Sequence, residues 1–259
     1  MLPLHGIGVL VTRPQHQAMP LCRLLEASGA CAFRLPAIDI KPLPEQRSMA
    51  SRLGRLEAFD LIIFTSSNAV RFGAALLEQR RDLALAAIGP ATARALNQAG
   101  YRVAVQPTDG FDSESLLKHP KLNSLAGSRI LLIKGVDGRE LLHHELERRG
   151  AQVTTADVYR RERAQPSAAE LSAMEAQFAA GAIQVITATS VEIAASLLEL
   201  ATPALRKDFE RAHWVVPGAR IAQSLRERGL PGVLLQADSA EDQDLVAAII
   251  RWRATESGA

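Results

Sequence analysis

Small hydroxyl side chains follow the end of one apolar segment in each half of the chain. Thr65, Ser66 and Ser67 follow the first segment, and Thr189 and Ser190 follow the second. Such residues cap the free amides in the first turn of a helix, and those amides, with the helix dipole, also bind anions. Capping alone explains either motif, so capping and anion binding remain alternatives. Two such helix starts would suit a ligand that carries several negative groups.

Glycine-containing turns follow a later apolar segment in each half. Gly89 and Thr92 belong to the first turn, and Gly218 and Arg220 to the second. Glycine allows a ligand to approach the backbone closely, and the threonine or the arginine could add a side-chain donor. Because neither turn has the P-loop or the G-x-G-x-x-G pattern, packing of the turn is an equal alternative to ligand binding.

Cations occur in a third turn, where Lys134 ends an apolar segment and Gly135 and Arg139 follow. Arginine at a helix start opposes the helix dipole, so a nearby anion must favour it. A bound carboxylate and a neighbouring Asp or Glu are both candidates for that anion. The counterpart of this turn in the first half is the segment VTRP, which contains Arg13.

Tyr159 is one of two tyrosines and lies in an extended, charged segment. Its hydroxyl could reach a ligand, and the alternative is an amphipathic residue that covers a hinge. His143 and His144 have no other ligand-type side chains nearby in the sequence, so we expect no metal site. The chain also has no G-x-S-x-G motif and no nucleotide fingerprint, so nothing supports a covalent or cofactor mechanism.

The elements that must position these residues alternate between short apolar strands and helical patterns. This alternation predicts parallel sheets with helices on both faces, because parallel neighbours need crossover connections. Five strands in each half predict an α/β fold of two doubly wound, flavodoxin-like sheets, with ligands at the carboxyl ends of the strands. The predicted strands are 7–12, 31–35, 61–65, 85–88, 102–105, 130–134, 152–157, 183–188, 214–216 and 233–235.

The two halves of the chain repeat one pattern. Helical segments end at Gly29 and Gly100 in the first half and at Gly150 and Gly229 in the second, so matched positions lie about 120 to 130 residues apart. A repeat of this length has the size of a small α/β domain. Two like domains that face each other would form one cleft, and we expect the ligand there.

Extended, proline-bearing segments at 36–44 and 158–166 occupy equivalent places and look like linkers. If the chain crosses between domains at both, the first domain is discontinuous. Two consecutive domains would bury the same strands, so the sequence leaves both arrangements open. The predicted boundaries are 1–37 and 163–259 for domain 1, 41–158 for domain 2, and 38–40 and 159–162 for the linkers.

Composition argues against several classes of protein. The 259 residues are 47% hydrophobic and 22% charged, as in a soluble globular protein. The formal net charge of +2 gives no basic field of the kind that a nucleic-acid binder carries. We find no export signal and no apolar run near the ~20 residues of a membrane span. Cys22 and Cys31 have neither disulfide nor metal-site spacing, which fits a reducing cytoplasm.

Taken in order, these motifs resemble uroporphyrinogen-III synthase. The resemblance extends over essentially the whole chain, although each motif is weak by itself. It rests on VTRP at 11–14, FTSSNAV at 64–70, IGPATA at 88–93, KG at 134–135 with Arg139, GA at 150–151 leading to VYR at 158–160, and TS at 189–190.

The resemblance implies a cytoplasmic lyase of class EC 4.2.1.75. Such an enzyme closes linear hydroxymethylbilane to uroporphyrinogen III, with inversion of ring D and loss of water. It implies no metal and no organic cofactor, and two flavodoxin-like domains, one of them discontinuous, joined by a two-stranded linker. A monomer without nucleic-acid or membrane partners is expected, and a handover of substrate from the preceding pathway enzyme is left open.

The resemblance also implies roles for individual residues. Tyr159 matches the linker tyrosine of the family, which is expected to assist the loss of hydroxide from the substrate. Ile221 stands opposite Thr92, so Arg220 is expected to replace a hydroxyl contact in the second half. The residues expected to hold the eight substrate carboxylates are Arg13, Ser66, Ser67, Thr92, Lys134, Gly135, Arg139, Thr189, Ser190, Gly218 and Arg220. A non-catalytic two-domain protein that binds a small polyanion in the same cleft remains the alternative.

Overall fold

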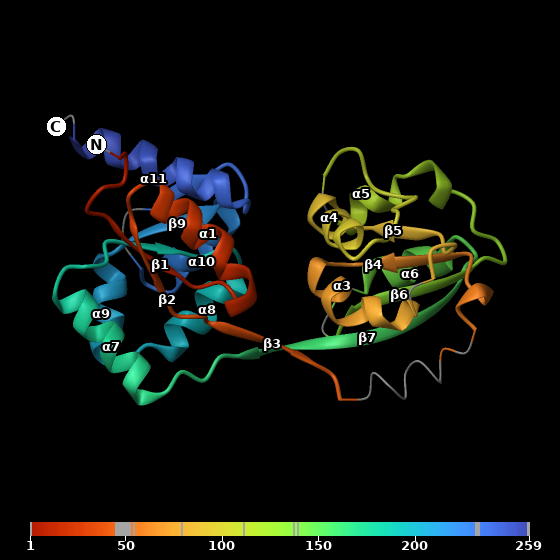
Figure 1. Ribbon diagram of the computed structural model, residues 1–259, viewed down its shortest axis with the longest axis horizontal. Helices are drawn as coiled ribbons and strands as arrows, with labels where there is room; N and C mark the ends of the chain where they lie inside the picture. The colour runs from red at the N-terminus through yellow and green to blue at the C-terminus, as the bar shows by residue number, and fades with distance from the viewer. Residues whose placement is uncertain are drawn as a thin grey trace. The chain divides into compact units, whose positions relative to one another are not determined.

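The chain forms two compact units in a computed structural model, which describes residues 2–44, 53, 55–78, 80–110, 112–136, 138, 140–230 and 234–257. Unit 1 consists of Met1–Asp39 and Glu162–Ala259, and unit 2 consists of Ile40–Arg161. Each unit is a five-stranded sheet with helices on both faces (Figure 1). The predicted α/β class with two parallel sheets is confirmed.

The sheet of unit 1 has the strand order β10-β9-β8-β1-β2, and all neighbouring strands are parallel. Numbered within the unit, this order is the 2-1-3-4-5 arrangement of flavodoxin-like folds. The central strand reads GVLV and is buried throughout, as expected for a parallel strand covered on both faces. The strands are β1 (Gly8–Val11), β2 (Cys31–Arg34), β8 (Val185–Thr187), β9 (His213–Pro217) and β10 (Leu234–Ala237).

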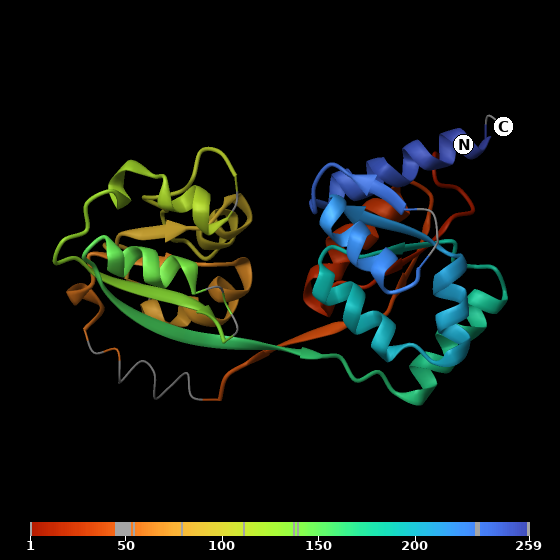
Figure 2. The same cartoon turned by 180° about the vertical axis from the view of Figure 1, so that it is seen from behind.

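Helices pack on the two faces of this sheet through apolar side chains. Leu21 of α1 and Ile249 of α11 share a core cluster with Val9 and Val11 of β1. The helices α7 to α10 lie on the opposite face, which Figures 1 and 2 show from the two sides. The helices are α1 (Gln15–Ala27), α7 (Ala168–Ala179), α8 (Val191–Leu200), α9 (Pro203–Arg211), α10 (Ala219–Glu227) and α11 (Asp242–Ser257).

The sheet of unit 2 has the order β3-β7-β6-β4-β5. Four strands are parallel, whereas β3 runs antiparallel to β7. Two hydrogen bonds show this direction: the Leu43 N–H donates to the Val158 carbonyl at 3.2 Å, and the Ala164 N–H donates to the Ala37 carbonyl at 3.1 Å. The pair β3 and β7 therefore occupies the segments that the sequence marks as linkers. The strands are β3 (Ile38–Pro42), β4 (Leu61–Phe64), β5 (Leu85–Ala87), β6 (Arg129–Gly135) and β7 (Gln152–Arg163).

Alternating side chains of β4 enter two different cores. Phe64 packs in one cluster with residues of α3 and α4, and Ile63 packs in the other with residues of α5 and α6, as the two-residue period of a strand requires. The helices of unit 2 are α3 (Ser67–Gly73), α4 (Pro90–Gln98), α5 (Ser113–Leu117) and α6 (Leu141–Arg148), with 3-10 helices η1 (Leu56–Ala58), η2 (Ala74–Leu77) and η3 (Pro120–Leu122).

The predicted strand at 102–105 is wrong. Only Val105 of this segment forms a bridge, with Ala86 of β5. Pro107 follows two residues later and has no N–H to continue a ladder. The fifth strand of unit 2 is instead β3, at the opposite edge of the sheet.

Candidate active site

In unit 2 the strand order brings two predicted site segments to one edge of the sheet. Phe64 of β4 is in register with Ile133 of β6, its parallel neighbour. Ser66 and Lys134, which follow these residues, therefore lie at the same carboxyl edge. This edge is the switch point of the sheet, where the connections from adjacent strands depart to opposite sides and α/β folds of this type bind ligands.

Unit 1 repeats this arrangement with its own residues. Val11 of β1 is in register with Thr187 of β8, so Arg13 and the Thr189–Ser190 pair follow at the same carboxyl edge. The Thr187 hydroxyl donates to the Leu10 carbonyl at 3.2 Å and helps to hold the two strand ends together. The structure thus gathers the predicted residues into two groups, one in each unit.

Tyr159 reaches the edge of unit 2 because β7 contains a bulge. Lys134 is paired with Asp157 and Gly135 with Tyr159, which leaves Val158 as the extra residue. Consecutive side chains of a regular strand point to opposite faces, but a bulge re-aims them. Val158 and Tyr159 accordingly share one core cluster, and Tyr159 is 3% exposed. The bulge therefore turns the phenol ring into the core that packs against α3.

The hydroxyl of Tyr159 is bonded to the residue that caps α3. Its oxygen lies 3.1 Å from the Ser66 Oγ, and either hydroxyl can donate. The Ser66 Oγ also accepts from the Ala69 N–H at 2.9 Å, which makes Ser66 the N-cap of the helix. The capping interpretation of Ser66 is thus confirmed, and the same oxygen also contacts the predicted catalytic residue.

Gly135 and Phe72 confine the ring of Tyr159. A Cβ atom on Gly135 would lie 2.6 Å from the Tyr159 Cζ and 3.0 Å from its hydroxyl oxygen. The ring of Phe72, in α3, lies with its centroid 6.0 Å from that of Tyr159 at an interplanar angle of 32°. Only a glycine at position 135 leaves room for the phenol in this orientation.

Lys134 is buried at this edge with two carboxylates near its ammonium group. The Lys134 Nζ donates to the Glu140 Oε1 at 2.7 Å and lies 3.9 Å from the Asp157 Oδ1. The hydrogen bond and charge of Lys134 hold the pKa of the Glu140 carboxyl below its usual value, which favours the ionised carboxylate. A neighbouring glutamate is therefore one anion beside the Lys134 ammonium.

The equivalent arginine of unit 1 has a similar partner. The Arg13 guanidinium donates to the Asp242 carboxylate and to the Ala240 carbonyl at the start of α11. The ion pair is largely shielded from solvent, because the Arg13 side chain is 13% exposed. Arg13 thereby joins the strand end of β1 to α11. Arg139, the second predicted cation of the unit 2 turn, lies outside the described residues.

The remaining hydroxyl residues occupy helix starts in different ways. Ser190 caps α8 by accepting from the Ile193 N–H at 3.1 Å, and Thr189 precedes it, half-buried. Ser67 is the first residue of α3 and is also half-buried. Thr92 lies in the first turn of α4 and is 3% exposed, as buried as Tyr159.

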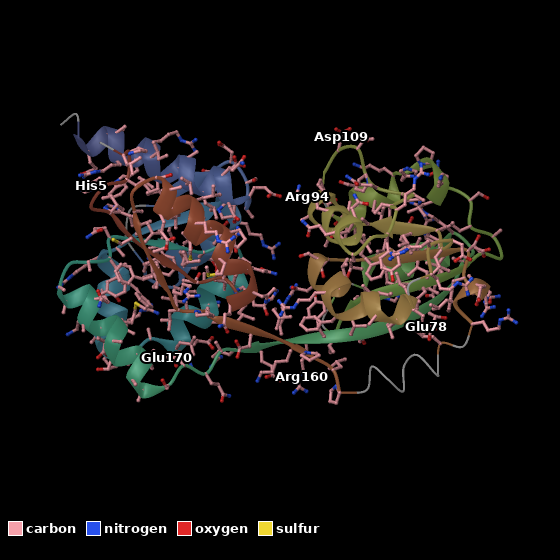
Figure 3. All side chains as sticks on the ribbon, viewed as in Figure 1. His5, Glu78, Arg94, Asp109, Arg160 and Glu170 are labelled. Atoms are coloured by element: carbon pink, nitrogen blue, oxygen red, sulfur yellow. The ribbon has the colours of Figure 1, made fainter. Side chains whose placement is uncertain are left out.

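The turn before α10 is open. Gly218 has φ +82° and ψ 163°, a conformation that side-chain-bearing residues rarely adopt. A Cβ atom on this glycine would meet nothing within 4 Å. Arg220 follows in the first turn of α10 and is exposed. Arg160, labelled in Figure 3, is likewise exposed and follows Tyr159 directly in β7.

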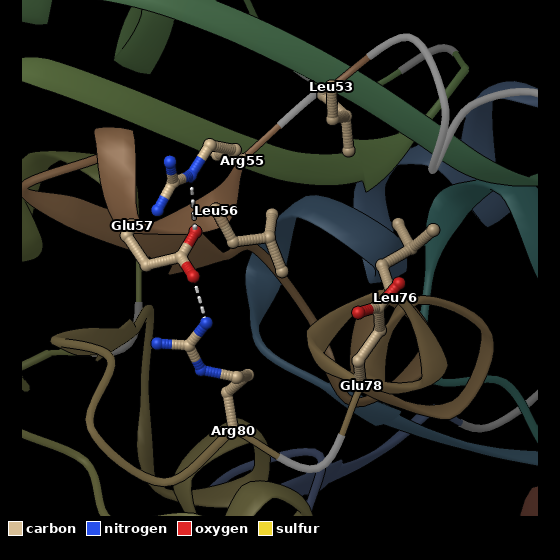
Figure 4. A pocket seen from close by; sticks show the side chains of 7 residues that line it. All are labelled: Leu53, Arg55, Leu56, Glu57, Leu76, Glu78 and Arg80. Atoms are coloured by element: carbon tan, nitrogen blue, oxygen red, sulfur yellow. Dashed lines mark hydrogen bonds and ion pairs between the residues drawn. The ribbon is translucent and has the colours of Figure 1, made fainter.

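A separate pocket of about 190 Å³ lies in unit 2 and contains no predicted site residue (Figure 4). Its lining residues precede β4 and β5, so it lies toward the amino ends of these strands, away from the ligand-binding edge. Glu57 pairs there with Arg80 and lies 3.9 Å from Arg55. The lining residues are Leu53, Arg55, Leu56, Glu57, Leu76, Glu78 and Arg80.

Sequence reasoning missed three residues that hold the site together. Glu140 could have been found, because it lies six residues after Lys134 across a glycine-containing turn. Asp242 is 229 residues from Arg13, and nothing in the sequence indicates their pairing. Phe72 is six residues beyond Ser66, the cap residue of its helix, but its contact with Tyr159 depends on the bulge in β7.

Comparison with known proteins connects this geometry with one family. The family model described as "Uroporphyrinogen-III synthase HemD" matches residues 20–247. Uroporphyrinogen-III synthase of Escherichia coli (strain K12) is 32% identical over 254 residues, which cover 94% of this chain and 100% of that protein. The enzyme of Salmonella typhimurium is 33% identical over the same shares of both chains.

The chain belongs to the uroporphyrinogen-III synthase family.

The family resemblance and the enzyme class predicted from the motifs are thereby confirmed. Solved structures agree on the fold. Uroporphyrinogen-III synthetase of Helicobacter pylori matches with a TM-score of 0.61 at 16% identity, covering 95% of this chain and 99% of that chain. A mutant synthase of Thermus thermophilus matches with a TM-score of 0.60 at 21% identity, covering 98% of this chain and 100% of that chain.

Neither a membrane-spanning helix nor a cluster of metal-ligating side chains occurs among the described residues. No helix among them is long and apolar enough to cross a membrane. Within the same part of the chain, no group of three or more His, Cys, Asp or Glu side chains could hold a metal ion.

Proposed function

We propose that the protein cyclises hydroxymethylbilane to uroporphyrinogen III, with inversion of ring D and loss of water. The observation that carries this proposal is the hydroxyl of Tyr159, bonded to Ser66 at the carboxyl edge of a flavodoxin-like sheet in a chain of this family. The proposed substrate, hydroxymethylbilane, is a small linear tetrapyrrole, and the family takes its name from the product. A monomeric state and a handover from the preceding pathway enzyme stay predictions.

Tyr159 is proposed to assist the departure of the substrate hydroxyl group. When the C–O bond breaks, its electron pair leaves with oxygen, and the adjacent pyrrole supplies electrons to form a cationic azafulvene. A phenol O–H that donates to the departing oxygen stabilises the charge developing there. Acid assistance of this kind contributes about 10²- to 10⁴-fold to a rate.

Carboxylates of the substrate are proposed to bind at the carboxyl edges of both sheets. An ammonium group has three donors, and Lys134 uses one on Glu140. A guanidinium has five, and Arg13 has donors left beyond those on Asp242 and Ala240. Charge-assisted hydrogen bonds from these cations would hold anionic substituents at fixed positions.

The other predicted contacts are hydroxyl groups, backbone amides and two further arginines. Thr189, Ser190, Ser67, Thr92 and Gly218 are proposed to offer hydroxyls or backbone amides at helix starts. Arg220 is exposed beside Gly218 and is proposed to donate where the second unit has Thr92. Arg139 keeps its predicted role in carboxylate binding. Such contacts would fold the linear substrate so that the inverted ring, and not the original one, is attacked.

Incubation with freshly made hydroxymethylbilane tests the proposal. Separation of the products by chromatography should show uroporphyrinogen III. Formation of the type I isomer alone, which arises without an enzyme, would refute the function. Binding of product without any change in isomer ratio would instead favour a non-catalytic polyanion-binding protein.

The variant Tyr159→Phe tests the role of the phenol. The ring and its packing on Phe72 stay, whereas the O–H that assists the leaving group is lost, so we expect turnover to fall at least about tenfold. Far-UV circular dichroism and the denaturation midpoint should stay near those of the wild type. A turnover equal to that of the wild type would remove Tyr159 from the mechanism.

A further inference from the structure

We infer that Ser66 is a positioning residue for Tyr159, and that its hydroxyl directs the phenol proton toward the substrate instead of binding a substrate carboxylate. The inference rests on the proposed function, because it assigns Ser66 a different task in the same site. It begins from the 3.1 Å separation between the two hydroxyl oxygens, which belong to residues 93 positions apart.

The hydrogen-bonding capacity of Ser66 is largely used within the protein. A serine hydroxyl has one donor and two acceptor lone pairs. The Ala69 N–H occupies one lone pair at 2.9 Å, and the bond with Tyr159 takes either the donor or the other lone pair. A substrate carboxylate can only accept a hydrogen bond, so it could bind only the single O–H of Ser66. The phenol oxygen of Tyr159 competes for that same O–H.

Either hydroxyl can donate in this bond, and the inference assigns the donor to Ser66. If Ser66 donates to the phenol oxygen, the hydrogen bonds form a series. The Ala69 N–H donates to the Ser66 Oγ, and the Ser66 O–H donates to the Tyr159 oxygen. Each bond in such a series polarises the next one. The phenol proton is then free to point toward the departing oxygen of the substrate, as the proposed role of Tyr159 requires.

The surroundings of the ring leave Ser66 as the group that orients the hydroxyl. Gly135 and Phe72 restrict the position of the ring, and Tyr159 is 3% exposed. The phenol O–H can still rotate about its C–O bond, and packing does not select its direction. A hydrogen-bond partner does, and Ser66 is that partner among the contacts of Tyr159 in the described residues.

The variant Ser66→Gly separates this role from helix capping. Glycine is tolerated at an N-cap much better than alanine, so Ser66→Gly removes the hydroxyl with little effect on the helix. We expect kcat to fall roughly tenfold with KM nearly unchanged, since a neutral hydrogen bond contributes about 0.5–1.5 kcal/mol and 1.4 kcal/mol is tenfold. Ser66→Thr keeps a hydroxyl and should restore most of the rate.

A double mutant distinguishes positioning from direct binding. If Ser66 acts through the phenol, adding Ser66→Gly to Tyr159→Phe should cause no further loss of kcat. If Ser66→Gly instead raises KM, and the free-energy effects of the two substitutions are additive, Ser66 is a direct ligand of the substrate and the inference is overturned. Ser167→Ala, which removes the capping serine of α7, is the control for a lost cap and should leave kcat unchanged.

Nuclear magnetic resonance of tyrosine labelled with ¹³C at Cζ tests the hydrogen bond without substrate. The chain has two tyrosines, so Tyr101→Phe assigns both signals. The Tyr159 signal should shift in Ser66→Gly and return in Ser66→Thr. A signal that does not move, or one that moves while kcat stays constant, would overturn the inference. If the wild type forms no type III isomer, the proposed function fails, and the signal still reports on the hydrogen bond.

Discussion

Substitution of Gly135 by alanine should disturb the active site through one atom. The new Cβ would lie 2.6 Å from the Tyr159 Cζ and 2.7 Å from its Cε2, whereas ordinary contacts begin at 3.4 Å. Either the ring or the end of β6 must therefore move by about 0.8 Å. The backbone of Gly135 is outside the left-handed region, so the effect is one of space and not of backbone strain.

The size of the effect follows from this overlap. Overpacking of a core by one methyl group costs about 1–3 kcal/mol. A ring displaced by 0.8 Å is enough to lengthen the 3.1 Å contact between Tyr159 and Ser66 beyond hydrogen-bonding distance. Misplacement on the order of 1 Å can cost about 100-fold in rate. We expect turnover of hydroxymethylbilane to fall about 10- to 100-fold.

Gly73→Ala is the matched control. Its Cβ would lie 2.6 Å from the Cγ2 of Ile133, an overlap of the same size in the same unit, and its next nearest contacts are with Val158 at 3.4 Å. Urea denaturation should show a similar loss of unfolding free energy for both variants, while the rate falls only for Gly135→Ala. Equal rates for the two variants would refute the reasoning, as would wild-type stability for Gly135→Ala.

Two pH-dependent effects are expected on stability, both measured by urea denaturation across pH. The Lys134 hydrogen bond lowers the folded pKa of Glu140, so the pair's contribution to stability is present above the unfolded pKa of about 4.3 and is lost as the pH falls through the folded pKa. Lys134→Met should reduce this loss of stability in acid. A stability profile equal to that of the wild type would contradict this prediction. Burial lowers the pKa of His213, opposed by the charge of Glu256, so stability should fall as the pH drops below about 6.5. His213→Leu should remove this dependence of stability on pH below about 6.5. If the wild type and the variant lose stability equally in this range, the prediction for His213 is wrong.

Much of the fold could be predicted because it depends on local patterns. The buried run at 61–64 reads as a parallel strand from its composition alone, and Ser66 and Ser190 read as helix caps from their position after such a run. The failure at 102–105 also has a local cause, since Pro107, two residues beyond Val105, has no N–H to continue a ladder beside β5.

The partner of Arg13 could not be predicted, whereas the partner of Lys134 lies only six residues away in the chain. For the turn from Lys134 to Arg139, the sequence leaves a substrate carboxylate and a neighbouring Asp or Glu as equal candidates for the nearby anion. The structure supplies Asp242 and Glu140. A charge is visible in a sequence, whereas the distance between two charges depends on how every intervening element packs.

By itself, the amino-acid sequence determined the α/β class, the repeated pattern of strand, cap and helix, and the family to which the chain belongs. The tertiary structure alone decided that Tyr159 meets Ser66. That contact requires β4 and β6 to be neighbours, a bulge that turns Tyr159 into the core, and a glycine opposite its ring. Each condition concerns residues far apart in the chain, and chain order carries no record of which of them become neighbours.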